Sequence, residues 1–255
     1  MNALIIGFGE VGRAHFENLK DTYKDTLYYK DIGPEIYNAS GECVGDFLEP
    51  LDIMMIATQC DPQDMSKFIK MVVDYDTIFC PKVIDILTTT PPGTAEEIQN
   101  KIGPGAKVSR SSIRGMHPNL SKFKCIPKHI GGAGKDMLKE FYEKCGWECV
   151  THETTRAVEL FHILNNMWYG ANVMFAAEAA KMCRAYAVDY MEFLKYRETN
   201  NIGFLKAGYP SKVSPIIYPP DGRIGGHCVC YAPTTIEDTI LGPIGKLLRD
   251  WNNAS

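Results

Sequence analysis

The sequence has no surplus of positive charge and no long apolar run. Its 27 Lys and Arg residues are outnumbered by 31 Asp and Glu residues, which gives a net charge of −4. A protein that binds a nucleic-acid backbone usually carries a basic excess, so nucleic acid is not an expected partner. No apolar stretch reaches the roughly 18 residues of a membrane span. The first residues also lack a basic leader and a cleavage site, so we expect a cytoplasmic protein without membrane attachment.

The nine cysteines have neither zinc-site spacing nor the density of a disulfide scaffold. In a chain of 255 residues without a secretory leader, we expect most of them to be reduced and buried. His227, Cys228 and Cys230 stand close together, but H-C-x-C lacks the second ligand pair of a structural zinc site. We therefore predict no metal site.

The first 152 residues alternate short apolar runs with helical patterns. Strands are expected at 3–6, 26–30, 53–57, 83–87, 107–109, 125–130 and 148–151. Helices are expected to follow the first strand and to span 94–102 and 135–145. This alternation is typical of a mostly parallel sheet with helices on both faces. We predict an α/β fold, with a Rossmann-type doubly wound domain over residues 1–152.

The pattern changes after residue 152. From Thr154 to Ala187 the chain has no proline and a single glycine, which predicts a helix of about 34 residues. A second helix is expected at 190–199, a loop over 203–226 and a last helix at 234–251, for which a break near Gly242-Pro243 is the alternative. The long helix has more apolar surface than a small domain can cover. We predict an all-helical domain over 153–255 that pairs two copies into a homodimer.

A G-x-G-x-x-G motif, formed by Gly7, Gly9 and Gly12, joins the first expected strand to the first helix. Such glycines allow a tight turn, close approach of a pyrophosphate and close packing of helix on strand. Asp31 follows Gly12 by 19 residues, where a carboxylate binds ribose hydroxyls and repels a 2′-phosphate. The pattern predicts NAD as cofactor, and a plain strand–helix turn is the alternative. The further cofactor-binding candidates are Glu10, Val11 and Thr58.

Two other segments carry groups suited to chemistry on a substrate. The segment 88–94 reads T-T-T-P-P-G-T and follows the strand at 83–87, at the sheet edge where such folds bind ligands. Thr89 is the candidate there, and Thr94 is expected to cap the next helix. In the second segment two glycines precede His227 and Cys228. Cys228 is a candidate thiolate nucleophile, or else a buried structural thiol.

The long helix adds a polar stripe. Glu159, His162 and Asn166 are spaced i, i+3 and i+7 and share one face. There His162 suits a proton carrier and Asn166 an oxyanion donor, or the stripe lies at a helix contact. His117 and Asn119, in a polar loop after a strand, are candidate substrate ligands or parts of a plain turn.

In this order, the motifs resemble the UDP-glucose/GDP-mannose dehydrogenase family. TTTPPGT resembles the family's S-T-V-P-P-G-T stretch, RAVELFHILNN the start of its subunit-pairing helix, and IGGHC its loop with the catalytic cysteine. The resemblance implies that Cys228 forms a thiohemiacetal, that Thr89 lies near the reacting centre and that Asn166 lies near the oxyanion. Family members oxidise a sugar-nucleotide alcohol to the acid in two NAD-dependent steps.

The sequence departs from this family at several positions. The family's helix lysine is His162, and the aspartate four residues after its cysteine is Ala232. The proline-glutamate of its substrate loop corresponds to 117–119, which holds no acid. No part of the chain matches the family's C-terminal nucleotide-binding domain. We therefore expect a short form that oxidises an alcohol or aldehyde carbon of a sugar nucleotide or a small sugar-like substrate.

Two alternatives stay open. The His117-Pro118 loop and Gly131-Gly132 resemble prephenate-dehydrogenase-like proteins, which share the plan of a nucleotide domain followed by a helical dimerisation domain. That resemblance, or a hydroxyacid dehydrogenase, implies a single hydride transfer without a covalent cysteine. The other alternative is a non-catalytic NAD-binding protein. The substrate-binding candidates are His117, Asn119, Arg223, Gly225, Gly226 and His227.

Overall fold

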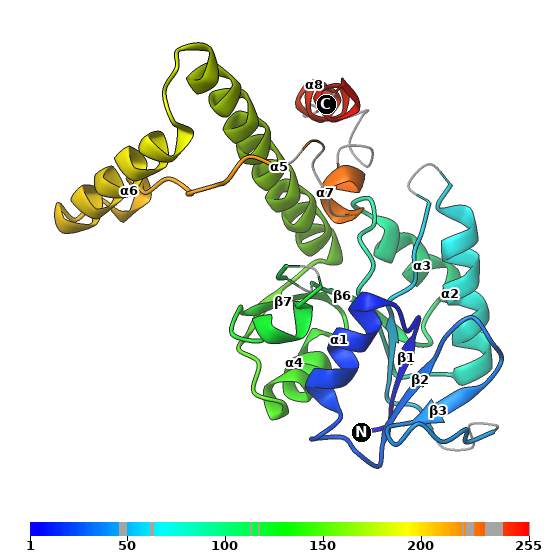
Figure 1. Cartoon of the computed structure of the whole chain (residues 1–255). Helices are drawn as coiled ribbons and strands as arrows, with labels where there is room; N and C mark the ends of the chain where they lie inside the picture. The colour runs from blue at the N-terminus through cyan, green and yellow to red at the C-terminus, as the bar shows by residue number, and fades with distance from the viewer. Residues whose placement is uncertain are drawn as a thin grey trace. The chain divides into compact units, whose positions relative to one another are not determined.

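The computed structural model describes residues 1–45, 50–61, 64–112, 114–116, 118–220, 222, 227–232 and 242–254 (Figure 1), with only the backbone at 227, 228 and 242. These residues fall into two compact units, Met1–Ile163 and Leu164–Ser255. The predicted domain boundary at residue 152 lies before this division, and the first turns of the long helix belong with the first unit.

The first unit is built on one sheet with the strand order β3-β2-β1-β4-β5-β6-β7-β8. The strands β2, β1, β4, β5 and β6 are parallel, β3 and β7 join the sheet antiparallel, and β8 runs parallel to β7. The bounds are β1 (Ala3–Ile6), β2 (Leu27–Lys30), β3 (Ile36–Asn38), β4 (Ile53–Ile56), β5 (Val83–Ile86), β6 (Lys107–Ser111), β7 (Lys128–Gly132) and β8 (Cys149–His152). The central β1 and the reversal of strand order beside it are those of a doubly wound, Rossmann-type sheet, and the predicted fold class is confirmed.

Helices cover both faces of this sheet (Figure 1). One face packs against α1 (Glu10–Leu19) and α4 (Lys135–Lys144), and the other against α2 (Ser66–Phe79) and α3 (Thr94–Ile102). A short 3-10 helix, η1 (Leu120–Phe123), precedes β7. Successive residues of a strand point to opposite faces. Accordingly, Ala3 and Ile5 belong to the first hydrophobic cluster, and Leu4 and Ile6 belong to the second.

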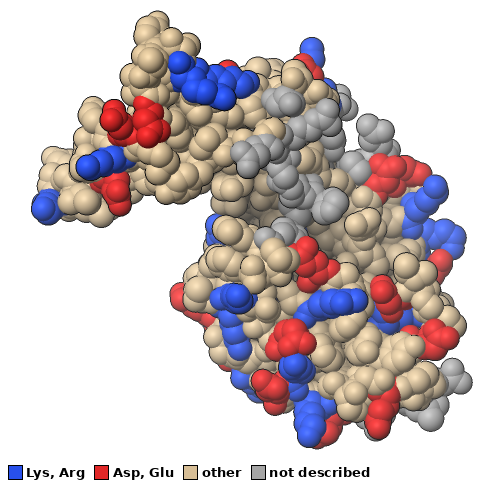
Figure 2. Space-filling view, in the orientation of Figure 1, with Lys and Arg blue, Asp and Glu red and all other residues tan. Residues whose placement is uncertain are grey.

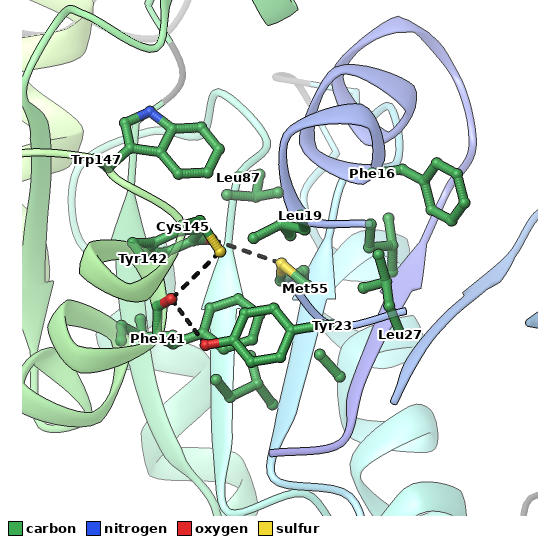
Figure 3. Packing of buried hydrophobic residues seen from close by; sticks show 14 of the residues in the cluster. Phe16, Leu19, Tyr23, Leu27, Met55, Leu87, Phe141, Tyr142, Cys145 and Trp147 are labelled. Carbon is green, nitrogen blue, oxygen red and sulfur yellow. Dashed lines mark hydrogen bonds between the residues drawn. The ribbon is translucent and has the colours of Figure 1, made fainter. Parts of the chain in front are cut away.

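Five aromatic side chains pack among aliphatic ones in the first cluster (Figure 3): Phe16, Tyr23, Phe141, Tyr142 and Trp147. The ring of Tyr23 stacks on that of Phe141 at a centroid distance of 4.3 Å, and its hydroxyl donates to the Phe141 carbonyl at 2.9 Å. The rings of Tyr142 and Trp147 meet edge to face at 5.3 Å. Large buried rings in these geometries contribute both apolar area and orientation. The Tyr142 hydroxyl also donates to Asp85 of β5 at 2.6 Å, which fixes α4 against the sheet.

The second unit continues the long helix α5 (Thr155–Ala185), whose 31 residues agree with the predicted long helix. It also contains α6 (Tyr190–Lys206), η2 (Pro210–Lys212), α7 (His227–Tyr231) and α8 (Gly242–Ala254). At Gly170 of α5 an added Cβ would lie 3.1 Å from Val229 and 3.8 Å from Leu248, so α7 and α8 both pack close to that helix. The Trp251 indole also donates to Glu178 at 2.6 Å.

The loop predicted over 203–226 begins too early, because α6 continues to Lys206. The side chain of Asn201 explains this extension. It donates to the Ser214 carbonyl at 2.7 Å and accepts from the Ser214 amide at 2.9 Å, which ties the last turns of α6 to the following segment. Among the described residues, no helix combines the length and apolar composition that crossing a membrane requires.

Candidate functional site

The three motif glycines have different structural roles. Gly7 follows β1 with φ of 92°, and an added Cβ would lie 2.9 Å from the backbone of Ala57 and Thr58. At Gly12 an added Cβ would lie 2.0 Å from the Gly7 carbonyl oxygen. At Gly9 nothing lies within 4 Å of the Cβ position. Gly7 and Gly12 are therefore required by close backbone packing, whereas Gly9 borders open space.

This open space lies at the N-terminus of α1, where Gly9 is the N-cap residue and supplies no side-chain acceptor. The partial positive charge of a helix N-terminus favours phosphate there. Asp31 follows β2 and accepts a hydrogen bond from the Phe8 amide through Oδ1, at 3.1 Å. The neighbouring Lys30 is buried and donates to the Gly33 carbonyl. An anion cradle beside an exposed carboxylate fits the pyrophosphate and ribose of a dinucleotide.

The other predicted cofactor-binding residues surround the same turn. Glu10 and Val11 form the first turn of α1. The backbone of Thr58 lies against Gly7, and its carbonyl accepts the Thr88 hydroxyl at 2.7 Å. This last bond joins the loop after β4 to the T-T-T-P-P-G-T turn after β5.

The structure places Thr89 against His162. Thr89 Oγ1 lies 3.0 Å from His162 Nε2, although the two residues are 73 positions apart in sequence. Burial, together with the positive charges of Arg110 and Arg114, lowers the pKa of His162 to about 3. The imidazole is therefore neutral near pH 7, unlike the fixed positive charge of a lysine.

Glu159, and not Thr94 as predicted, supplies the side-chain acceptor at the N-terminus of α3. Thr94 is already the first residue of α3, and its hydroxyl donates to the Pro91 carbonyl at 2.8 Å, so the predicted cap is wrong. The carboxylate of Glu159 instead accepts the amides of Gly93 at 2.6 Å and Ala95 at 3.0 Å. The Thr90 hydroxyl adds a third bond at 3.2 Å. The sequence does not show which groups Glu159 contacts, because Glu159 and Ala95 are 64 residues apart.

The remaining predicted residues are not brought to this pair by the described contacts. Asn166 follows His162 by one helical turn on α5, and its buried Nδ2 has no hydrogen-bond partner among the described residues. Asn119 is exposed and precedes η1. Outside the described residues lie His117, Arg223, Gly225 and Gly226, together with the side chains of His227 and Cys228.

The described part of the chain offers no group of three or more His, Cys, Asp or Glu side chains that could hold a metal ion. On the face shown in Figure 2, acidic and basic side chains are interspersed over the surface of the first unit. This mixture agrees with the small net charge of −4.

No protein-family model and no curated protein matches this sequence. Solved structures do match it over nearly its whole length. A UDP-D-ManNAc dehydrogenase from Pyrococcus horikoshii is 17% identical with a TM-score of 0.77, covering 99% of this chain and 68% of that one. A UDP-glucose dehydrogenase from Pyrobaculum islandicum is 15% identical with a TM-score of 0.71, covering 100% and 68%.

A third similar structure is 3-hydroxyisobutyrate dehydrogenase from Mycobacterium tuberculosis with L-serine. It is 13% identical with a TM-score of 0.69, and the match covers 98% of this chain and 91% of that one. The chain thus shares with these proteins the fold of a Rossmann-type domain followed by helices built on one long helix.

Proposed function

We propose that the protein is an NAD-dependent oxidoreductase that oxidises an alcohol or aldehyde carbon of a sugar nucleotide or a small sugar-like substrate. The observation that carries this proposal is the open space at Gly9, bordered by the N-terminus of α1 and the Asp31 carboxylate. The fold supports it, because the similar structures named above are dehydrogenases. We further propose that it acts in the cytoplasm as a homodimer.

In this proposal, the residues of the first unit bind and orient while the cofactor supplies the redox chemistry. NAD, when bound, takes up a hydride from the substrate carbon. Gly7, Gly9, Gly12 and the first turn of α1 would hold its phosphates, and Asp31 its ribose hydroxyls.

Thr89 and His162 are assigned to the substrate oxygen. With a pKa of about 3, His162 is too weak a base to take up the hydroxyl proton near neutral pH, so it acts here by orienting the Thr89 hydroxyl. The proton of the substrate hydroxyl then passes to water. Asn166 lies on the same helix, and its buried Nδ2 has no hydrogen-bond partner among the residues that the structure describes, so it is proposed to bind the substrate oxygen.

Cys228 is assigned to a second oxidation step. Its thiolate would add to the aldehyde carbon to form a thiohemiacetal, the form from which a second two-electron oxidation would give a thioester, and water would then release the acid and the thiol. His117, Asn119, Arg223, Gly225, Gly226 and His227 are the proposed substrate ligands.

A second candidate is a single-step hydroxyacid dehydrogenase in which Cys228 is structural. The observation that favours it is the fold shared with the 3-hydroxyisobutyrate dehydrogenase, at a TM-score of 0.69. Cys228→Ala separates the two candidates. In the first, alcohol oxidation continues but aldehyde oxidation stops; in the second, the substitution leaves turnover unchanged.

Calorimetric titration with NAD and NADP, alone and with sugar nucleotides or hydroxy acids, tests the proposal. We expect NAD to bind, and one substrate class to tighten its binding. NAD binding without NADH formation from any alcohol, aldehyde or hydroxy acid would favour a non-catalytic NAD-binding protein. Absence of dinucleotide binding would overturn the proposal.

A further inference from the structure

We propose that Glu159 is a positioning residue that holds the T-T-T-P-P-G-T turn in register with α5, so that Thr89 meets His162. This inference rests on the proposed function for its catalytic meaning, because Thr89 and His162 are the residues assigned to the substrate oxygen. The geometry that it explains stands by itself in the first unit.

Three residues of α5, each three positions from the next, contact consecutive parts of the turn and of α3. Arg156 pairs with Glu96, Glu159 accepts from Gly93 and Ala95, and His162 lies against Thr89. Residues three apart on a helix lie on neighbouring turns of nearly the same face. One face of α5 is therefore aligned along residues 89–96, and a shift by one helical turn would break all three contacts.

Among these contacts, the one made by Glu159 is buried. Glu159 is 1% exposed, whereas the side chains of Arg156 and Glu96 are 62% and 38% exposed. Exposed ion pairs contribute little to stability, and a buried carboxylate that receives several hydrogen bonds contributes more. Its three donors are spread over residues 90–95, on both sides of the two prolines. The carboxylate thus fixes the path of the whole turn.

Because Gly93 has no side chain, the N-terminus of α3 needs an acceptor from elsewhere, and Glu159 supplies it. Gly93 has φ of 99° and is the N-cap residue of α3, so no side chain of its own can accept the first amides of that helix. Without Glu159, the part-buried Gly93 amide and the buried Ala95 amide would lose their acceptor, and the turn would have to rearrange to reach another. Rearrangement of residues 90–93 would displace Thr89 directly.

Burial raises the pKa of Glu159, while the two amides, Arg110 and the Thr90 hydroxyl oppose that rise. The groups facing it from the turn and from α3 are thus hydrogen-bond donors, and Arg110 of β6 adds positive charge. The ionised carboxylate is the form that accepts all three bonds, and the positive end of α3 favours that form.

The test reads the environment of His162 in the folded protein by ¹⁵N NMR of the imidazole rings. His162→Asn identifies the His162 signal among those of the six histidines. In the unsubstituted protein we expect a neutral ring, with Nε2 hydrogen-bonded and no titration down to pH 5. In Glu159→Ala we expect loss of that hydrogen-bonded signature and a titration midpoint shifted toward the ordinary value of 6.5.

Conservative and neighbouring variants separate positioning from general destabilisation. Glu159→Gln retains one side-chain oxygen as acceptor, so the NMR signal of His162 should keep part of its hydrogen-bonded character. Thr90→Val removes one of the three bonds to Glu159 and should shift the His162 signal slightly. Arg156→Ala removes the exposed ion pair between α5 and α3 and should leave the NMR signal of His162 unchanged. With a substrate that is turned over, Glu159→Ala should lower kcat at least about tenfold while the Kd for NAD changes by less than about twofold.

A folded Glu159→Ala protein with the His162 spectrum and titration of the unsubstituted protein would overturn the proposal. If Glu159→Ala does not fold, Glu159→Gln and Thr90→Val decide it by the same spectrum. Failure of the unsubstituted protein to bind NAD would overturn the proposed function instead, because the NMR result does not depend on the cofactor.

Discussion

Replacing Gly12 by alanine should lower the stability of the protein, whereas replacing Gly9 by alanine should weaken NAD binding. Gly12→Ala places a methyl group 2.0 Å from a backbone oxygen, and we expect a loss of about 3 kcal/mol in the free energy of unfolding. Gly9 has φ of −70° and open space around its Cβ position, so Gly9→Ala should change that free energy by less than about 0.5 kcal/mol. We nevertheless expect it to weaken NAD binding at least about tenfold, because the methyl group occupies the space for the phosphates. Urea unfolding and calorimetry measure the two effects.

Gly203→Ala is the matched control for these glycines. Gly203 lies in α6 with nothing within 4 Å of its Cβ position. Alanine favours a helix over glycine by about 0.5–1 kcal/mol, so the variant should gain stability and bind NAD unchanged. Tight NAD binding by Gly9→Ala would show that the glycine motif is only a turn.

Lys128 should make the free energy of unfolding change with pH between about pH 8 and pH 10.5. It is 2% exposed, and its ammonium group donates to His15 Nε2 at 2.8 Å and lies 4.3 Å from the centre of the Tyr142 ring. Burial lowers its pKa from 10.5 to about 8. Between these pH values the unfolded chain binds more protons than the folded chain, so the free energy of unfolding rises with pH. The expected contribution is about 3 kcal/mol.

Lys128→Met isolates this contribution from the other groups that titrate at alkaline pH. The difference in the free energy of unfolding between the original protein and the variant should grow in favour of the original between pH 8 and pH 10.5. Urea titrations at several pH values measure it. A difference that stays constant over this range would contradict the lowered pKa.

At the scale of single elements, α6 depends on a local cap. Asp189 precedes the helix in an extended conformation, and its side chain accepts the Met191 amide at 2.9 Å. Asp189→Ala should cost about 1 kcal/mol, seen as faster hydrogen exchange in the first turn of α6, while Asp189→Asn should keep most of the protection. Equal exchange in all three proteins would show that packing alone holds this end of the helix.

The bounds of some helices and strands can be predicted from the local sequence alone. The strand Ala3–Ile6 and the helix Thr94–Ile102 have the predicted bounds, because an apolar run and a Pro-Gly turn mark their limits. The end of α6 was not predictable, since Asn200, Asn201 and Gly203 are weak helix formers and the bonds from Asn201 to Ser214 are known only from the fold.

In the candidate site, too, some features follow from local sequence and others only from the fold. Local spacing is enough to predict the glycine motif and Asp31, because neighbouring residues form that turn. Spacing along α5 also predicts that Glu159 and His162 share a face. It does not tell which groups that face meets. The contacts of Glu159 with Gly93 and of His162 with Thr89 join residues 66 and 73 positions apart.

For the whole molecule, we expect pairing through the second unit. Trp168, Phe175 and Met182 of α5 are 57%, 55% and 66% exposed. They are seven residues apart, so they form one apolar stripe along the helix. A stripe of this kind is typical of a helix that packs against a partner, and we propose a second copy of the chain.

Phe175→Glu tests this pairing, because a charge in the centre of the stripe should oppose burial. Sedimentation should show a dimer for the original protein and a monomer for the variant, with unchanged NAD binding. Lys195→Glu, on the exposed surface of α6, is the control for added negative charge. A monomeric original protein, or a dimeric Phe175→Glu, would contradict the proposed stripe.

The cap that Glu159 places on α3 also has a consequence for biosynthesis. A ribosome adds residues in order, so the turn at 88–93 emerges well before Glu159, which supplies the acceptor for its amides. Until then the nascent sheet has its central strands but carries an unfinished turn at the edge where Thr89 lies. The first unit is therefore complete only when the opening turns of α5 have left the ribosome, and the residues assigned to chemistry are among the last of that unit to reach their final geometry.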